Sequence, residues 1–241
     1  MKIILCGYHW AGCRALDLLL EQATELFVYT HEAPYHVADL MALANARNIR
    51  FSCEKISVSN LPFDPDILVS VYYRYIIPGD VINACQQKAI NLHPSLLPRY
   101  RGCSSLTWAI INGESEVGYS YHYIDETIDT GNILVQQNIP VYDWDTQGSL
   151  YYRVMFEALT TLLPVVQKVL AGEPGAPQQG TPSYYKRGAP YGGEIASQWP
   201  LEKVARFIRA MTFPPYPEAT YQGESVRTLD DFKQLLDRDI P

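Results

Sequence analysis

Hydrophobic and polar positions divide the first half of the chain into two kinds of segment. The apolar runs that have the length and composition of buried strands are residues 2–6, 25–30, 67–73 and 89–92. The segments between them that carry apolar residues at helical density are 15–20, 34–46 and 78–85. Because these predicted strands alternate with helices, the pattern predicts an α/β fold with a doubly wound, mostly parallel sheet.

The pattern changes after about residue 112. Residues 117–124 and 133–140 alternate as strands do, and we expect them to form an antiparallel pair that extends the sheet. Residues 146–170 predict one long amphipathic helix, with Leu150, Val154 and Ala158 at four-residue spacing. A stretch rich in Gly and Pro, 171–190, indicates a boundary. We therefore expect a main domain over 1–180 and a small α+β appendage over 181–241.

Composition and charge exclude several classes of protein. Of the 241 residues, 47% are hydrophobic and 19% are charged, which is ordinary for a globular chain with a sizeable core. A net charge of −7 argues against a nucleic-acid partner, which needs a broad basic face. The five cysteines form no CxxC pair, and no apolar run approaches the length of a membrane span. We expect a cytoplasmic protein with no structural metal and no membrane partner.

Candidate chemistry lies at the end of the strand predicted over 89–92. Residues i and i+2 of a strand project to the same side, so Asn91 and His93 point together, at the edge where open α/β sheets bind ligands. Asp129, in the turn-rich segment before Gly131, is the candidate for a third polar group. From spacing alone, a structural role is as compatible with the sequence as a functional one. Asn91 and His93 could simply end a strand, and Asp129 could be an ordinary turn residue.

Two motifs carry a family resemblance. The segment INLHPSLLPRYRG, followed by IDETIDTGNIL, resembles the formyltetrahydrofolate-dependent formyltransferases, and the match extends over about residues 1–170. The resemblance makes 1–180 the catalytic domain and implies formyl transfer from N10-formyltetrahydrofolate to a primary amine, without a metal. The family's catalytic residues correspond to Asn91, His93 and Asp129. Asn91 and His93 would donate to the carbonyl oxygen as it gains negative charge, and Asp129 would orient His93 and help to remove the amine proton.

The resemblance also implies where the folate binds. In the family, backbone groups of two loops hold the pterin ring. The corresponding residues of this chain are Tyr75, Ile76 and Ile77 in one loop, and Asp125, Glu126, Thr127, Ile128 and Asp129 in the other. The alternative for Ile76 and Ile77 is ordinary core packing.

Three branches of the family differ in the amine that they formylate. The glycinamide ribonucleotide branch has a small-residue loop after the first strand, where this chain carries CGYHWAG. The methionyl-tRNA branch has a basic C-terminal barrel, whereas this chain is acidic and continues about fifty residues beyond residue 190. The segments VYYRYIIP and NLHPSLLPRYRG resemble the nucleotide-sugar branch. The expected substrate-binding residues are Tyr73, Arg74, Arg99, Tyr100, Arg101, Lys186, Arg209 and Phe213.

The resemblance favours one class of sugar. We expect dTDP-4-amino-4,6-dideoxyglucose as substrate, for synthesis of a surface polysaccharide such as O-antigen, and a homodimer whose C-terminal appendage contributes to sugar-nucleotide binding and dimerisation. A UDP-linked sugar and a 3-amino isomer stay open. The alternatives are a formyltransferase for methionyl-tRNA or another amine, and, in a different class, a non-catalytic module that binds a nucleotide or folate.

Overall fold

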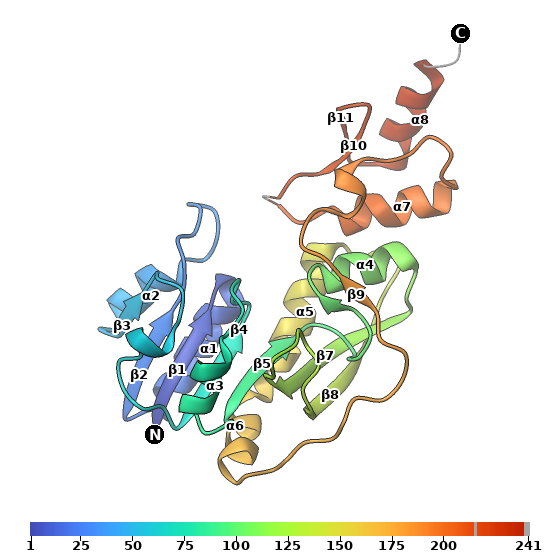
Figure 1. Ribbon diagram of the computed structural model, residues 1–241. Helices are drawn as coiled ribbons and strands as arrows, with labels where there is room; N and C mark the ends of the chain where they lie inside the picture. The colour runs from blue at the N-terminus through green and yellow to red at the C-terminus, as the bar shows by residue number, and fades with distance from the viewer. Residues whose placement is uncertain (215, 239–241) are drawn as a thin grey trace. The chain divides into compact units, whose positions relative to one another are not determined.

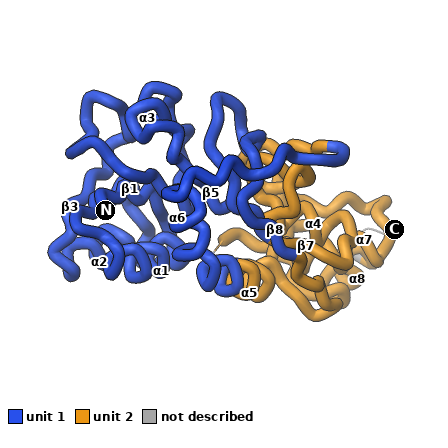
Figure 2. The backbone as a smooth tube through the Cα atoms, turned by 90° about the horizontal axis from the view of Figure 1, so that it is seen from below, with its two compact units in different colours: residues 1–93, 119–137, 155–181 blue, residues 94–118, 138–154, 182–241 orange. Residues whose placement is uncertain are grey.

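The computed structural model describes residues 1–214 and 216–238. The chain forms two compact units, coloured separately in Figure 2. The first comprises residues 1–93, 119–137 and 155–181, and the second comprises 94–118, 138–154 and 182–241. The chain thus passes between the units several times. The expected functional division into 1–180 and 181–241 stays a prediction.

A seven-stranded sheet has the order β3-β2-β1-β4-β5-β7-β8. Its strands are β1 (Lys2–Gly7), β2 (Glu25–Tyr29), β3 (Arg50–Ser52), β4 (Ile67–Val71), β5 (Ala89–His93), β7 (Glu116–Tyr123) and β8 (Ile133–Pro140). The pairs among β1 to β5 are parallel, and β7 runs antiparallel to β5. The predicted α/β class with a mostly parallel sheet is confirmed.

Helices lie on both faces of this sheet. In Figure 2, α3 (Gly79–Ala84) lies on one side of β1, and α1 (His9–Leu20) and α2 (Leu40–Ala46) lie on the other. The α3 side is sealed by a hydrophobic cluster in which Val81 and Ile82 pack with Ile4, Cys6 and Leu68. Such two-sided cover suits strands that are buried along almost their whole length, as β1 after Lys2 and β4 are.

Three predicted helices differ from the observed ones. The segment 15–20 is the second half of a longer helix, α1, which begins at His9. The segment 34–46 becomes helical only at Leu40, because the carboxylate of Asp39 caps the helix by accepting from the backbone N–H groups of Met41 and Ala42. The expected single helix over 146–170 is two helices, α5 (Gln147–Thr160) and α6 (Leu162–Leu170). Pro164 has no N–H for the carbonyl of Thr160, and its ring would clash with that carbonyl in a continuous helix.

The second unit contains short strands and two packed helices. Its elements include β6 (Arg101–Gly102), α4 (Ser105–Asn112), β9 (Tyr184–Tyr185), α7 (Leu201–Ala210), β10 (Ala219–Tyr221), β11 (Glu224–Val226) and α8 (Leu229–Arg238), and all of them except β6 are labelled in Figure 1. Strands β6 and β9 pair in parallel, β10 and β11 form an antiparallel pair, and α4 packs against α7. Two 3-10 helices, Val58–Asn60 and Pro190–Gly193, complete the elements of the described residues. In residues 1–214 and 216–238, no helix has both the length and the apolar character needed to cross a bilayer.

Candidate active site

The end of β5 and the adjacent strand β7 place polar side chains next to one another on the same face of the sheet. The antiparallel register pairs Asn91 with His122 and His93 with Ser120. Directly opposite residues of such a pair project to the same face, and so do residues two apart on one strand. The Nδ2 atom of Asn91 accordingly lies 3.2 Å from Nε2 of His122, and His93 lies on the same face.

Asp129 reaches this group from the loop between β7 and β8. Its Oδ2 atom lies 3.5 Å from Nδ1 of His93, and its Oδ1 atom lies 3.4 Å from Nε2 of His122. The side chains of His93, His122 and Asp129 are 6%, 2% and 11% exposed. We call Asn91, His93, His122 and Asp129 the polar centre. All of them belong to the first unit.

The backbone around Asp129 is held in place by several contacts. Asp129 has φ of 56°, in the left-handed region that aspartate tolerates better than most residues. The Nε2 atom of Gln178 donates to the carbonyl oxygens of Asp129 (2.8 Å) and Gly131 (2.9 Å). A Cβ atom at Gly131 would lie 1.9 Å from the carbonyl oxygen of Tyr123, so this position requires glycine. These contacts fix the direction in which the Asp129 carboxylate points.

Hydrogen bonds within the loop between β7 and β8 also order its first residues. The Oδ1 atom of Asp125 accepts from the backbone N–H of Thr127 (3.1 Å) and from the hydroxyl of Thr130 (2.6 Å). Asp125, Glu126, Thr127 and Ile128 are all exposed. The loop therefore presents a shaped, accessible surface, as a backbone-recognition loop for a planar ring would need.

The loop after β4 contains the other residues expected to bind folate. Ile77 is buried in the hydrophobic cluster beneath α3, whereas Ile76 is 65% exposed. The rings of Tyr73 and Tyr75 meet edge to face, and the hydroxyl of Tyr73 accepts from the backbone N–H of Ile56. Burial raises the pKa of Tyr73. Arg74 is exposed and lies over the ring of Tyr75. Ile76 is thus the apolar side chain of this loop that is accessible to a ligand.

An aromatic group also occupies the carboxyl ends of β1 and β2. The rings of Tyr8 and His31 stack with centroids 3.8 Å apart, and His31 meets the edge of Tyr75. Burial raises the pKa of Tyr8, while the nearby Arg74 charge opposes that shift. The aromatic residues of the CGYHWAG segment therefore pack against other loops at the ligand edge of the sheet.

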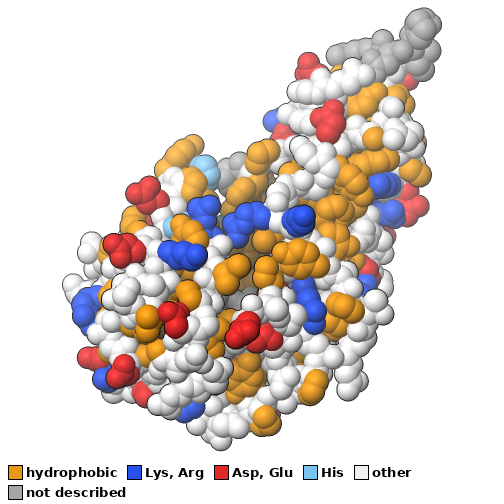
Figure 3. All heavy atoms as spheres, viewed as in Figure 1, with side chains coloured by type: hydrophobic (Ala, Val, Ile, Leu, Met, Phe, Trp, Pro, Cys, Tyr) orange, Lys and Arg blue, Asp and Glu red, His pale blue; other side chains and the backbone are white. Residues whose placement is uncertain are grey.

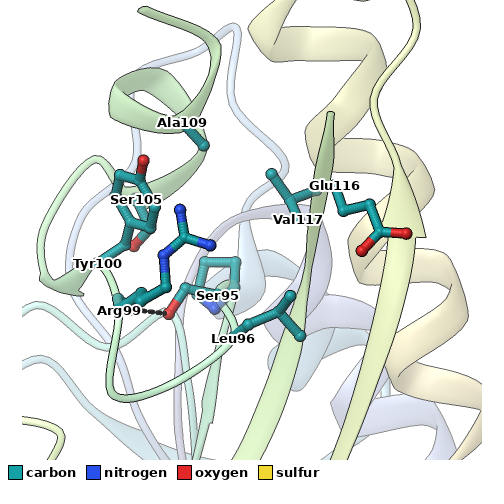
Figure 4. Close-up of a pocket in the computed structure, with 9 residues that line it drawn as sticks. Ser95, Leu96, Arg99, Tyr100, Ser105, Ala109, Glu116 and Val117 are labelled. Atoms are coloured by element: carbon teal, nitrogen blue, oxygen red, sulfur yellow. Dashed lines mark hydrogen bonds between the residues drawn. The ribbon is translucent and has the colours of Figure 1, made fainter. Parts of the chain in front are cut away.

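In the second unit, Arg99 and Tyr100 share one internal partner. Both donate to Oε1 of Glu114, and the ring of Tyr100 stacks on Tyr185. Burial, together with the Glu114 hydrogen bond, raises the pKa of Tyr100 to about 12. Figure 4 shows Arg99 and Tyr100 among the residues around a cavity of about 10 Å³, where the hydroxyl of Ser95 donates to the carbonyl oxygen of Arg99. That volume admits about one water molecule and no larger ligand.

Other residues expected to bind substrate are spread over the second unit. Arg209 donates to the carbonyl oxygens of Tyr142 (3.3 Å) and Asp145 (2.9 Å), and Phe213 is buried. Arg101 lies in β6. Lys186 is exposed and forms no ion pair with the residues that the structure describes. Acidic, basic and hydrophobic side chains occur together on the face shown in Figure 3. Substrate contacts of these residues stay predictions.

Comparison with known proteins identifies the family. Residues 22–166, more than half of the chain, match the model of the family described as "Formyl transferase". The chain belongs to the formyltransferase family. A curated relative is the GDP-perosamine N-formyltransferase of Brucella melitensis biotype 1. It is 38% identical over 252 residues, covering 100% of this chain and 97% of that protein. The family and its named relatives identify an N-formyltransferase.

Solved structures of formyltransferases share the fold. The N-formyltransferase from Helicobacter canadensis, in complex with folinic acid and dTDP-3-aminofucose, has a TM-score of 0.80 at 21% identity, with 94% of this chain and 86% of that chain covered. WlaRD, a sugar 3N-formyl transferase crystallised with dTDP and 5-N-formyl-THF, has a TM-score of 0.77 at 22% identity, with 94% and 85% covered. These similarities confirm the formyltransferase fold of this chain.

Two residues in and beside the polar centre were not predicted from the sequence. His122 lies on a predicted strand where polar residues alternate with tyrosines, and that alternation could have indicated a polar face. Gln178 lies in the stretch rich in Gly and Pro that predicted a boundary, and its local sequence contains no indication of a contact with Asp129. Among the described residues, no group of three or more His, Cys, Asp or Glu side chains is arranged to hold a metal ion.

Proposed function

We propose that this formyltransferase transfers the formyl group of N10-formyltetrahydrofolate to the amino group of a nucleotide-linked sugar, GDP-perosamine. The observation that carries the reaction is the meeting of Asn91, His93 and Asp129 in one largely buried polar centre. The sugar is supported by the full-length similarity to a GDP-perosamine N-formyltransferase. GDP-perosamine therefore replaces dTDP-4-amino-4,6-dideoxyglucose as the first choice of substrate.

The polar centre has the groups that this chemistry requires. When an amine attacks a formyl carbon, negative charge develops on the carbonyl oxygen, and N–H donors directed at that oxygen stabilise it. Asn91 offers its carboxamide N–H and His93 a ring N–H. The Asp129 carboxylate lies 3.5 Å from Nδ1 of His93, where it can orient the ring, and it can accept the proton that the amine loses, directly or through water. Burial of these groups strengthens each of these interactions.

The folate supplies the formyl group, and two loops of the first unit fit its ring. The exposed side chain of Ile76 provides apolar surface, and the 125–128 segment provides accessible backbone groups. The loop with Ile76 follows β4, whose carboxyl end lies at the ligand edge of the sheet, and the 125–128 segment follows β7, which runs antiparallel to β5 and is linked to Asp129 by the same loop. Gln178 donates hydrogen bonds to the carbonyl oxygens of Asp129 and Gly131, which lie in the same loop as the 125–128 segment. These hydrogen bonds hold that part of the loop without a ligand.

The amine is tested with a panel of substrates. The purified chain is incubated with N10-formyltetrahydrofolate and GDP-perosamine, dTDP-4-amino-4,6-dideoxyglucose, a dTDP-3-amino sugar, a UDP-aminosugar or methionyl-tRNA. Mass spectrometry then detects the added formyl group. We expect GDP-perosamine to have the highest kcat/KM. A preference for a dTDP-linked or UDP-linked sugar would contradict the nucleotide assignment. Formylation of methionyl-tRNA alone, or of no compound, would contradict the whole proposal.

A further inference from the structure

We propose that His122 is a positioning residue of the formyl-transfer site, and that it acts as a neutral imidazole with its proton on Nδ1. In this form it holds the Asn91 carboxamide through Nε2 and leaves the Asp129 carboxylate to His93. The inference deepens the proposed function, on which its kinetic test rests.

The position of the proton follows from the partners of the ring. Nδ1 of His122 lies 2.7 Å from the carbonyl oxygen of Tyr123. A carbonyl oxygen can only accept, so Nδ1 must carry a hydrogen. In a neutral ring the other nitrogen, Nε2, is then an acceptor. Its neighbour at 3.2 Å is Nδ2 of Asn91, which is a donor. The two contacts are chemically consistent only in this tautomer, with the Asn91 amide in its present orientation.

Holding Asn91 in this way leaves it ready for the substrate. The carboxamide nitrogen has two hydrogens, and His122 takes one of them, so the other is available to a formyl oxygen. Preorganised donors of this kind stabilise developing charge because they need not reorient during the reaction. The cross-strand register of β5 and β7 places His122 directly opposite Asn91, which makes the contact a property of the fold.

The same tautomer determines which of the two imidazoles, His93 or His122, can donate a hydrogen bond to Asp129. Nε2 of His122 is 3.4 Å from Oδ1 of Asp129, and Nδ1 of His93 is 3.5 Å from Oδ2. A lone pair on Nε2 cannot donate, so of the two imidazoles His93 is the one that can donate to the carboxylate. An imidazolium at His122 would instead compete for Asp129 and would oppose the N–H of Asn91. His122 therefore affects both Asn91 and Asp129.

The carbonyl that fixes the tautomer is itself held tightly. The backbone N–H of Tyr123 donates to the carbonyl oxygen of Asn132 at 2.9 Å, and Gly131 packs so closely on the Tyr123 carbonyl that no side chain fits there. With His122 only 2% exposed, water has little access to the ring. The hydrogen bond to Tyr123 thus has few competitors.

A direct test reads the tautomer in the wild-type chain. The five histidines are labelled with 15N, and two-bond 1H–15N correlation spectra report which ring nitrogen carries the proton. The signal of His122 is assigned as the one that is lost in His122→Gln. We expect a neutral ring protonated on Nδ1 at neutral pH. An imidazolium, or a neutral ring protonated on Nε2, would overturn the proposal, and this result does not depend on the identity of the sugar.

Kinetics then test the role. Gln offers an acceptor oxygen to Asn91, whereas Phe keeps the volume of the ring without an acceptor. We expect His122→Phe to lower kcat about 100-fold and His122→Gln to lower it less than about tenfold, with KM changed less than about twofold in both. The control is His36→Gln, the same exchange at an exposed histidine, which should leave kcat unchanged. Equal losses in the Gln and Phe variants would contradict the acceptor role.

A double-mutant cycle separates positioning from general damage. If His122 acts through Asn91, then His122→Phe should cost little further activity in an Asn91→Ala background. A purely structural role would give the same fold-loss in both backgrounds and would overturn the proposal. Should the wild-type chain formylate no sugar of the panel, the proposed function would be wrong, while the spectra would still decide the state of His122.

Discussion

The polar centre of the first unit and the arginines of the second unit use their hydrogen bonds differently. In the polar centre, Asn91, His93, His122 and Asp129 face one another at 3.2 to 3.5 Å from two strands and a loop. In the second unit, five arginines bind acidic side chains or backbone carbonyls of the same unit. The pairs are Arg99 with Glu114, Arg153 with Asp145, Arg206 with Glu202, Arg209 with the carbonyls of Tyr142 and Asp145, and Arg227 with Glu218.

This difference shows which sequence features indicate a site. Buried polar groups that converge from separate elements are costly unless they are paired, so their convergence points to chemistry. A cation near an aromatic residue is common on any surface, and the contacts of Arg209 show that it can have a structural role. Lys186, exposed and with no ion pair among the described residues, is the better candidate for a phosphate contact.

The largest expected effect is at Asp129. Asp129→Asn keeps the shape of the side chain, and asparagine also tolerates the φ of 56°, so the backbone should be unchanged. The variant loses the charge that orients His93, and we expect kcat to fall at least about 100-fold. Steady-state kinetics with saturating GDP-perosamine and formyl donor measure the loss. Thermal melting confirms folding, and a kcat close to wild type would remove Asp129 from the mechanism.

A smaller effect is expected at Gln178, which supports the polar centre from outside. Gln178→Leu removes both hydrogen bonds to the carbonyls of Asp129 and Gly131 and should let the Asp129 carboxylate lose its direction. We expect kcat to fall by about tenfold to 30-fold, because the two hydrogen bonds contribute about 1 kcal/mol each and about 1.4 kcal/mol corresponds to a factor of ten in rate. Gln179→Leu, at the exposed neighbour, is the matched control. Equal activity of the two variants would show that Gln178 does not position the loop.

The smallest effect separates two cations of the second unit. Lys186→Met should raise the KM for the nucleotide sugar about threefold and leave thermal stability unchanged, as expected for one exposed charge on a phosphate. Arg209→Met should instead lower the melting temperature, because it removes donors from the carbonyls of Tyr142 and Asp145. Kinetics and thermal melting of both variants give the comparison. A raised KM without a lowered melting temperature in Arg209→Met would return Arg209 to the substrate site.

Much of the fold could be predicted from the sequence because its causes are local. The apolar runs of β1, β4 and β5 have the composition of buried strands, and their alternation with helices implies the parallel sheet. The exceptions are also local in origin. Asp39 delays the start of α2, and Pro164 divides the long helix. Both signals are visible in the sequence, although periodicity alone does not weigh them.

Spacing in the sequence could predict only those site residues that lie on a single strand. The two-residue spacing places Asn91 and His93 on one face, but Asp129 was assigned by family resemblance and not by spacing. His122 depends on the register of β5 against β7, which no property of either strand determines. The pairing of Arg99 with Glu114 depends on how the chain folds around α4. Such contacts are tertiary choices that a linear pattern does not contain.

The contact of Gln178 with the Asp129 loop affects the order in which parts of the site can form during synthesis of the chain. Residues 174–178 run back beside the start of β8, where Ala176 and Ile133 exchange backbone hydrogen bonds. During synthesis, β5 and β7 can pair as soon as residue 123 has left the ribosome, but the carbonyl of Asp129 meets its donor only after residue 178 has emerged. A nascent chain that stops at α6 would contain every residue of the polar centre and still lack the support that directs its carboxylate.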